Sequence, residues 1–127
     1  MIVGIGTDVV EVRRISQALE RFGDRFVERI LAPEERARFE RVRLKANHLA
    51  KRFAAKEAFA KAIGTGIRAP FTWHSVTVGR EASGMPLLNP SADMARYLAT
   101  RGVTNAHLSF TDDAGVAVAF VILEGRH

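Results

Sequence analysis

The chain of 127 residues contains no cysteine, which excludes disulfide frameworks, thiol nucleophiles and metal sites with cysteine ligands. Long apolar runs are also missing. The longest, residues 116–123, has eight residues, whereas a membrane-spanning helix needs about 18. The N-terminus has no basic flank, and Asp8 interrupts its apolar stretch, so it does not resemble a signal peptide. We expect a soluble cytoplasmic protein, without a membrane partner, whose chemistry uses oxygen and nitrogen side chains.

Internal repeats, low-complexity segments and linkers are absent from the sequence as well. With 47% apolar and 26% charged residues, the composition is typical of one globular domain, spanning residues 1–127. A chain of this length can bury roughly two-thirds of its unfolded surface around one core. We therefore do not expect disorder, a collagen-like structure or tandem domains.

The net charge of +5 is concentrated in one half of the chain. Residues 13–61 hold fourteen of the nineteen lysines and arginines but only seven of the fourteen acids, a local charge of +7. Such a field attracts nucleic acid, phosphorylated small molecules or an acidic protein surface. A merely solvated helical surface would have the same composition, so charge alone does not choose among these partners.

Hydrophobic periodicity and turn residues predict the order of the elements. Strands are expected at residues 1–12, 73–78, 87–88, 106–110 and 116–123. Helices are expected at residues 12–22, 24–31, 33–44, 47–63 and 91–100. Asn47 would be the N-cap of the longest helix, and Gly64 would end it. This order lacks βαβ alternation and indicates an α+β fold, with an antiparallel sheet packed against a helical block that has one long central helix.

The last predicted strand is unusual because residues 116–123 are apolar at every position. Antiparallel strands normally alternate apolar and polar side chains, since one face meets water. Both faces of this strand should therefore be covered. A neighbouring subunit of a symmetric homo-oligomer would cover the second face, and a fully internal strand is the alternative.

Asp8 and Glu57 are isolated acids on apolar faces. Asp8 shares its strand face with aliphatic residues and glycines, and Glu57 falls inside the helical stripe of Leu49, Phe53 and Ala60. A carboxylate among apolar neighbours is costly to ionise unless a cation or hydrogen-bond donors accompany it. Glu57 could obtain such a cation simply, through an i, i+4 ion pair with the lysine one turn later in the helix.

Two carboxylates without a nearby histidine or cysteine suit a hard cation that prefers oxygen ligands. Mg²⁺ is often held by one or two carboxylates while waters and substrate phosphates complete its octahedron. Arg52, Lys56 and Lys61 flank Glu57 in the sequence and would face phosphates or their leaving groups. The combination indicates metal-assisted phosphoryl or phosphodiester chemistry.

Other candidate motifs are incomplete. Gly4 and Gly6 lack the third glycine of a dinucleotide-binding fingerprint, so they indicate close approach of the first strand to another element. His107 and Ser109 share a strand face, but no third group is placed to orient the histidine as a catalytic triad requires. His107 is therefore expected to donate a hydrogen bond rather than to act as a base.

A candidate docking surface comprises three arginines, Arg14, Arg21 and Arg25. They lie within about 40° of one another if the helix continues through Gly23. Guanidinium groups gathered on one side would meet an acidic partner. A hydrated helix face is the alternative.

Two motifs resemble those of the bacterial holo-acyl-carrier-protein synthases, members of the 4′-phosphopantetheinyl transferase superfamily. The family has a Gly-x-Asp near the start, which Gly6 and Asp8 match. It also has an aromatic-x-x-Lys-Glu-Ala-x-x-Lys helix, which is matched by Phe53, Lys56, Glu57, Ala58 and Lys61. The resemblance spans essentially the whole chain, including the ending "HLSFTDDAGVAVAFVILE". It implies the fold of these transferases.

The resemblance implies transfer of the 4′-phosphopantetheine arm of coenzyme A to a serine of apo acyl carrier protein, with release of adenosine 3′,5′-bisphosphate. It also implies that Asp8 and Glu57 bind Mg²⁺ and that Lys61 stabilises the leaving group. The coenzyme-binding residues that it implies are Arg52, Lys56, Lys61, Gly64, Thr65, Gly66 and, from an adjacent subunit, His107. Short members of the family are homotrimers with active sites between subunits, which would cover the last strand.

The acidic carrier protein supplies a partner for Arg14, Arg21 and Arg25. Many relatives have a second histidine where this chain has Thr111 and Asp112, so we assign no acid–base role there. The base that deprotonates the carrier serine is open between Glu57 and a metal-bound water.

Two other functions are compatible with parts of the sequence. A basic nucleic-acid-binding domain would explain the positive half, but it leaves Asp8 and Glu57 without a role, and few aromatic residues lie among the basic ones for base stacking. A Mg²⁺-dependent phosphohydrolase would turn over without an acceptor protein. We expect coenzyme A and apo acyl carrier protein as partners, and no nucleic acid.

Overall fold

A computed structural model describes residues 1–126. Its strands are β1 (Ile2–Glu11), β2 (Val76–Arg80), β3 (Pro86–Pro90), β4 (Val103–Asp113) and β5 (Val116–Gly125). Its helices are α1 (Val12–Phe22), α2 (Asp24–Ile30), α3 (Pro33–Arg41), α4 (Lys45–Ala62) and α5 (Ala92–Thr100). Within these residues, no helix is long and apolar enough to cross a membrane.

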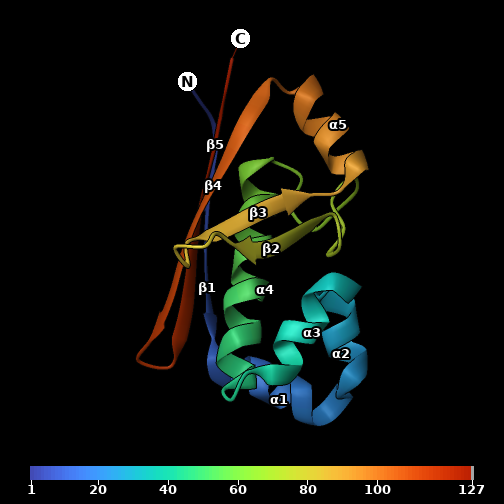
Figure 1. Ribbon diagram of the computed structural model, residues 1–127, viewed down its shortest axis with the longest axis vertical. Coiled ribbons are helices and arrows are strands. Elements are labelled where there is room, and N and C mark those ends of the chain that lie inside the picture. The colour runs from blue at the N-terminus through green and yellow to red at the C-terminus, as the bar shows by residue number, and fades with distance from the viewer. Residues whose placement is uncertain (127) are drawn as a thin grey trace.

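The three long strands form an antiparallel sheet in the order β1-β5-β4, and β2 and β3 form a separate antiparallel pair. Helix α4 lies along one face of the long sheet, with α1, α2 and α3 gathered at its first turns and α5 near the opposite end (Figure 1). The two chain ends lie side by side (Figure 1), where the backbone N–H of Gly125 donates to the carbonyl of Met1 at 2.8 Å. The arrangement confirms the predicted α+β fold.

Helix α4 is the centre of the molecule. Eleven of its 18 residues are buried, because the sheet covers one side and the other helices and the β2–β3 pair cover the rest. Two clusters of buried apolar side chains meet along it, one toward α5 and one toward α1–α3. A charged residue on α4 is therefore buried unless it faces one of the few gaps in this cover.

Gly4 and Gly6 bring β1 against the last turns of α4. A Cβ atom on Gly4 would lie 2.1 Å from the carbonyl oxygen of Ala62, and one on Gly6 would lie 1.9 Å from that of Ala58. These distances are far inside van der Waals contact, so only glycine permits the packing. The predicted close approach is confirmed, and it brings the strand that carries Asp8 onto the helix that carries Glu57.

The boundary between α3 and α4 differs from the prediction. Helix α3 ends at Arg41, earlier than expected, because the ammonium group of Lys45 donates to three carbonyl oxygens at its end, at 2.9–3.2 Å. Helix α4 then begins at Lys45, so the prediction of Asn47 as N-cap is wrong. The Asn47 amide instead donates to Oδ2 of Asp112 at 2.9 Å, which joins α4 to the β4–β5 hairpin.

The two faces of β5 have different surroundings. Its inward side chains are buried against α4 and comprise Ala117, Ala119, Val121 and Leu123. The opposite face is open in a single chain, where Phe120 is 40% exposed and neighbouring Ile5 and Val9 of β1 are 57% and 60% exposed. The alternative of a fully internal strand is therefore wrong for one chain, and the second apolar face is uncovered.

Candidate active site

Asp8 and Glu57 line one cavity of about 360 Å³ between β1, α1 and α4. Arg14 of α1 lines the same cavity. The remaining wall is mostly apolar and comprises Val9, Val10, Ile15, Ala18, Phe26 and Phe53. The structure thus brings together two carboxylates that lie 49 residues apart in the sequence and adds a guanidinium group to them.

Lys61 pairs with Asp8 and not with Glu57. Its ammonium nitrogen lies 3.1 Å from Oδ1 of Asp8 and donates to the carbonyl of Thr7 at 2.9 Å. The alternative of an i, i+4 ion pair between Glu57 and Lys61 is therefore wrong. The Asp8 side chain is 14% exposed and that of Lys61 is 51% exposed, so the ammonium group is within reach of a ligand.

Glu57 carries the perturbed carboxylate of the cavity. Burial raises its pKa above the ordinary value, the nearby charge of Asp8 raises it further, and Lys61 opposes both effects. Among residues 1–126, no hydrogen bond or ion pair satisfies the Glu57 carboxylate. Two acids that repel each other in a partly apolar cavity form a site that gains stability when it binds a cation.

The donor set of the cavity fits Mg²⁺. In the described part of the chain, no group of three or more histidine, cysteine or acidic side chains could hold a metal. Asp8 and Glu57 could supply two oxygen ligands, and waters and substrate phosphates would have to supply the others. Mg²⁺ commonly binds in this way, whereas zinc and calcium usually take more ligands from the protein.

Arg52 and Lys56 do not line this cavity, and their expected contact with the coenzyme stays a prediction. Lys56 is 0% exposed and donates to Glu35 and to two backbone carbonyls. Arg52 is 2% exposed, and its guanidinium carbon lies 5.1 Å from the ring centroid of Phe110. Both side chains are buried because α4 is covered almost all round.

A second basic cluster surrounds the first turns of α4. Burial lowers the pKa of His48 to about 3, and the charges of Arg52, Arg38, Lys51 and Arg80 add to this effect. Burial and the charges of Arg80 and Arg38 also lower the pKa of Arg52, to about 10. The positive half of the sequence thus contains a cluster here that is separate from the arginines of α1 and α2.

The turn Gly64-Thr65-Gly66 follows α4 as predicted. Gly64 and Gly66 have φ values of +84° and +60°, in the region that favours glycine, and the N–H of Gly66 donates to the carbonyl of Ala60 at 3.2 Å. The turn begins three residues after Lys61. Its expected contact with the coenzyme stays a prediction.

His107 lies on the outer face of the sheet, away from α4. Its Nε2 atom is 3.0 Å from Oε1 of Glu124, and this hydrogen bond lowers the pKa of Glu124. His107 does not line the carboxylate cavity of its own chain. A contribution to a neighbouring subunit's site stays a prediction.

The predicted docking arginines are arranged differently from the extrapolated helix. Gly23, with φ +56°, separates α1 from α2, so Arg25 lies on another helix than Arg14 and Arg21. Arg25 lines a groove of about 300 Å³ with Phe22, Phe26 and Arg29. Sequence reasoning missed Phe26, which lines both this groove and the carboxylate cavity. Only the packing of α2 against α1 places Phe26 in the wall of that cavity, and the local sequence does not show this packing.

Asp112 forms structural contacts that join β4 to α4. Its Oδ1 atom lies 3.0 Å from the ammonium group of Lys51, and hydrogen bonds from Asn47 and Lys51 lower its pKa. An acid held ionised in this way is a weak base.

The sequence model of the 4′-phosphopantetheinyl transferase superfamily matches residues 4–121. The chain belongs to this superfamily. The matched region contains the cavity residues Asp8, Arg14 and Glu57 and the turn after α4.

Individual superfamily members are similar over nearly the full chain. A protein of Azoarcus sp. named holo-[acyl-carrier-protein] synthase is 52% identical over 126 residues, which cover 99% of this chain and 100% of the relative. The crystal structure of holo-[acyl-carrier-protein] synthase from Neisseria meningitidis matches with a TM-score of 0.94 at 43% identity, covering 98% of this chain and 99% of that one. The Helicobacter pylori synthase in complex with coenzyme A matches with a TM-score of 0.85 at 30% identity, covering 94% and 99%.

Proposed function

We propose that the protein transfers the 4′-phosphopantetheine group of coenzyme A to a serine hydroxyl of apo acyl carrier protein and releases adenosine 3′,5′-bisphosphate. The observation that carries this proposal is the cavity in which Asp8 and Glu57 lie together beside Lys61. Relatives named holo-[acyl-carrier-protein] synthase at 43–52% identity support it, as does the similar fold of a coenzyme A complex.

The chemistry requires charge neutralisation at a pyrophosphate. The serine oxygen forms a bond to the phosphorus of the phosphopantetheine group, the bond from that phosphorus to the adenosine bisphosphate breaks, and the serine proton passes to a base. Asp8 and Glu57 would hold Mg²⁺, which when bound neutralises charge on the pyrophosphate. The exposed ammonium group of Lys61 would stabilise the leaving phosphate, and Arg14 would orient a second anionic oxygen.

The carrier protein would dock on the groove of α1 and α2. Arg25 and Arg29 supply positive charge there, and Phe22 and Phe26 supply an apolar floor. Because Phe26 also lines the carboxylate cavity, a carrier bound in the groove has a short path for its serine to reach Glu57. An acidic protein with an apolar patch matches both the charge and the apolar floor.

We further propose that the protein forms a homotrimer. We also propose that it works in the cytoplasm and serves fatty-acid biosynthesis. The open apolar face of β1 and β5 supports the assembly, since exposed apolar patches of this kind mark protein interfaces. His107 lies on the same outer face of the sheet, where a neighbouring subunit would reach it.

Intact-mass measurement of the carrier tests the proposed function. Incubation with coenzyme A, Mg²⁺ and apo carrier protein should increase the carrier's mass by one phosphopantetheine group. A carrier with a serine-to-alanine change at the acceptor site is the matched control and should keep its mass. Release of phosphate from coenzyme A without a carrier would instead favour a phosphohydrolase, and protection of nucleic acid without any mass change would favour a binding domain.

A further inference from the structure

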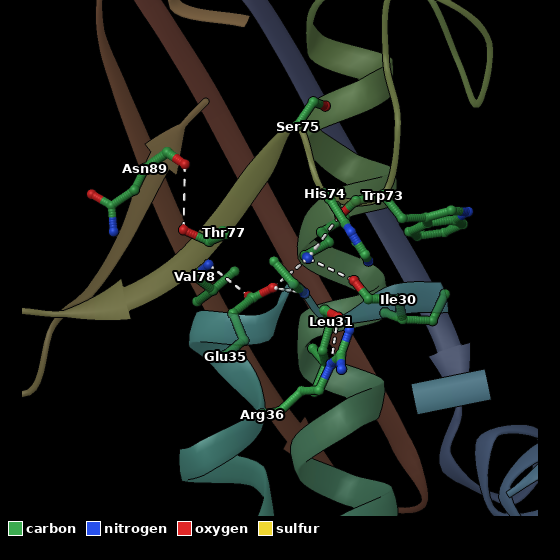
Figure 2. Close-up of polar contacts among 12 residues, drawn as sticks. Ile30, Leu31, Glu35, Arg36, Trp73, His74, Ser75, Thr77, Val78 and Asn89 are labelled. Atoms are coloured by element: carbon green, nitrogen blue, oxygen red, sulfur yellow. Dashed lines mark hydrogen bonds and ion pairs between the residues drawn. The ribbon is translucent and has the colours of Figure 1, made fainter. Parts of the chain in front are cut away.

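A buried ion pair lies behind the wall of the carboxylate cavity. The ammonium group of Lys56 and Oε1 of Glu35 are 2.7 Å apart, and the two residues are 0% and 7% exposed. Lys56 also donates to the carbonyls of Ile30 at 2.7 Å and Trp73 at 2.8 Å, so each of its three protons has an acceptor. In Figure 2, Glu35 and these carbonyls converge on one point between α3, α4 and β2.

Glu35 extends the same network to two backbone N–H groups. Its Oε1 accepts from Ala32 at 2.9 Å, and its Oε2 accepts from Val78 in β2 at 2.9 Å. The pair therefore binds four backbone groups from different segments. These are Ile30 at the end of α2, Ala32 before α3, Trp73 in the loop before β2, and Val78 in β2. Apolar residues of similar volume often stabilise a fold as well as a buried ion pair does, but they cannot bind four separate backbone groups.

Trp73 connects the network to the cavity. Lys56 holds its carbonyl, while its ring stacks on Phe53 with centroids 5.0 Å apart and an interplanar angle of 26°. Phe71 packs edge-on with the indole, with ring centroids 5.8 Å apart and an interplanar angle of 74°. Phe53 lies one helical turn before Glu57 and forms part of the cavity wall. A shift of Trp73 would therefore change the wall beside Glu57.

We propose that Lys56 and Glu35 are positioning residues for the transfer reaction, because their ion pair holds Trp73 against Phe53 and so sets the shape of the cavity beside Glu57. This inference rests on the proposed function. It gives Lys56, which lies next to Glu57 in the sequence, a role that needs no contact with coenzyme A.

The composition of the chain permits a sharp test, because it contains no cysteine and a single tryptophan. In the variant Lys56→Cys, the only thiolate can be alkylated in urea before refolding. Displacement of bromide from 2-bromoethylamine attaches an aminoethyl group, which restores an ammonium group at the reach of lysine. Alkylation with iodoacetamide attaches a neutral amide of similar length and is the matched control.

We expect the aminoethylated variant to match the wild type in tryptophan emission and in kcat. The amide-bearing variant should emit at longer wavelength, because Trp73 leaves its stack, and its kcat should be lower by about tenfold or more, since small misplacements in a site are costly. Both are measured at a temperature where each is folded. Leu98→Ala, a core change in α5, controls for stability: it should lower Tm while leaving emission and kcat unchanged.

Trp73→Ala gives a second test in case the amide-bearing variant does not refold. It keeps the lysine and the ion pair but removes the ring behind Phe53, so kcat should fall to a similar extent. Equal kcat and emission for the two alkylated forms, or wild-type kcat for Trp73→Ala, would overturn the inference. If the wild type itself transfers nothing to the carrier, the proposed function fails, and the emission comparison still decides whether Lys56 positions Trp73.

Discussion

At the residue scale, the two carboxylates of the cavity have different partners and therefore different properties. Asp8 is paired with Lys61 at 3.1 Å, whereas Glu57 has no partner among the described residues and a raised pKa. Both lie in a partly apolar cavity, where their mutual repulsion is weakly screened. The repulsion favours binding of a cation. The ionisation of Glu57 can then be followed through the pH dependence of cation binding.

We predict that Glu57→Gln and Asp8→Asn each give a folded protein with little transfer activity. The amide keeps the shape but loses the charge that would hold Mg²⁺, and turnover should fall by about 100-fold or more, since loss of outer-shell partners alone typically costs 10- to 100-fold. Thermal unfolding with and without Mg²⁺ and coenzyme A gives a second readout: only the wild type and the exposed-surface control Glu81→Gln should be stabilised. Normal kcat at saturating Mg²⁺ would refute the metal site.

The raised pKa of Glu57 predicts a pH dependence of Mg²⁺ binding. Since the folded state binds the Glu57 proton more tightly than the unfolded chain does, this group's contribution to stability is present below its ordinary pKa of 4.5 and is lost as the pH rises through the raised value. Mg²⁺ needs the ionised form, so its affinity should fall as the pH falls through the same range. Calorimetric titration with Mg²⁺ at several pH values measures this. Glu57→Gln should show no Mg²⁺ binding at any of these pH values, and pH-dependent binding that persists in that variant would assign the dependence to another group.

At the element scale, the site depends on the contact between β1 and α4, which Gly6 permits. Gly6→Ala places a methyl group about 1.9 Å from the carbonyl oxygen of Ala58, so the strand and helix must separate. We expect a loss of about 1–3 kcal/mol in the free energy of unfolding, the usual cost of overpacking, and a fall in transfer activity at temperatures where the protein is folded. Urea unfolding measures the first effect. Gly79→Ala is the control, because its new methyl group meets only the flexible side chain of Asn89.

The helix pair α1 and α2 makes a separate prediction about the carrier. Arg25→Glu reverses a charge in the groove outside the carboxylate cavity, so the KM for carrier protein should rise several-fold while the KM for coenzyme A changes little. Added salt should weaken the carrier interaction of the wild type more than that of the variant. Arg96→Glu in α5 is the matched reversal at a distant exposed site. Equal loss for both substrates would show that Arg25 contacts the coenzyme or supports the fold.

At the scale of the whole molecule, the sheet covers α4 with one face and leaves its other face apolar and open. Phe120 lies at the centre of this outer face. It pairs with Thr7 of β1 on one side and with Ser109 of β4 on the other. A monomer seldom leaves such a patch in water. The same face carries His107, so assembly and catalysis would depend on one surface.

We predict that the wild type is a trimer and that Phe120→Asp is a monomer. A buried unpaired carboxylate in the interface is costly, whereas the same residue on an open face is not. Light scattering at micromolar concentration should give three times 14.0 kDa for the wild type and 14.0 kDa for the variant. The variant should also lose transfer activity while still unfolding cooperatively, as a folded monomer does. An active wild-type monomer would refute the shared site.

Local sequence decides some elements of this fold and leaves others to contacts between distant residues. The 3.6-residue period and the glycines at 23 and 64 predicted α1 and the end of α4, because local backbone preferences decide them. The prediction of Asn47 as N-cap was wrong because α4 already begins at Lys45. The side chain of Lys45 donates to the carbonyl of Phe39, six residues earlier, and so caps the end of α3. Glu35 was missed because nothing in its local sequence shows that Lys56 will lie 2.7 Å away.

The sequence by itself determined the order of the elements and the two motifs that carry Asp8 and Glu57, since periodicity, turn residues and spacing are local properties. Only the tertiary structure decided which charged residues of α4 face a cavity. Lys56, Glu57 and Lys61 lie within six residues of one helix, yet one is fully buried, one lines the cavity and one is half exposed. The angular position of a residue on a helix is fixed by the sequence, but the elements that pack against that angle come from distant parts of the chain, and they set its burial, its partners and its charge.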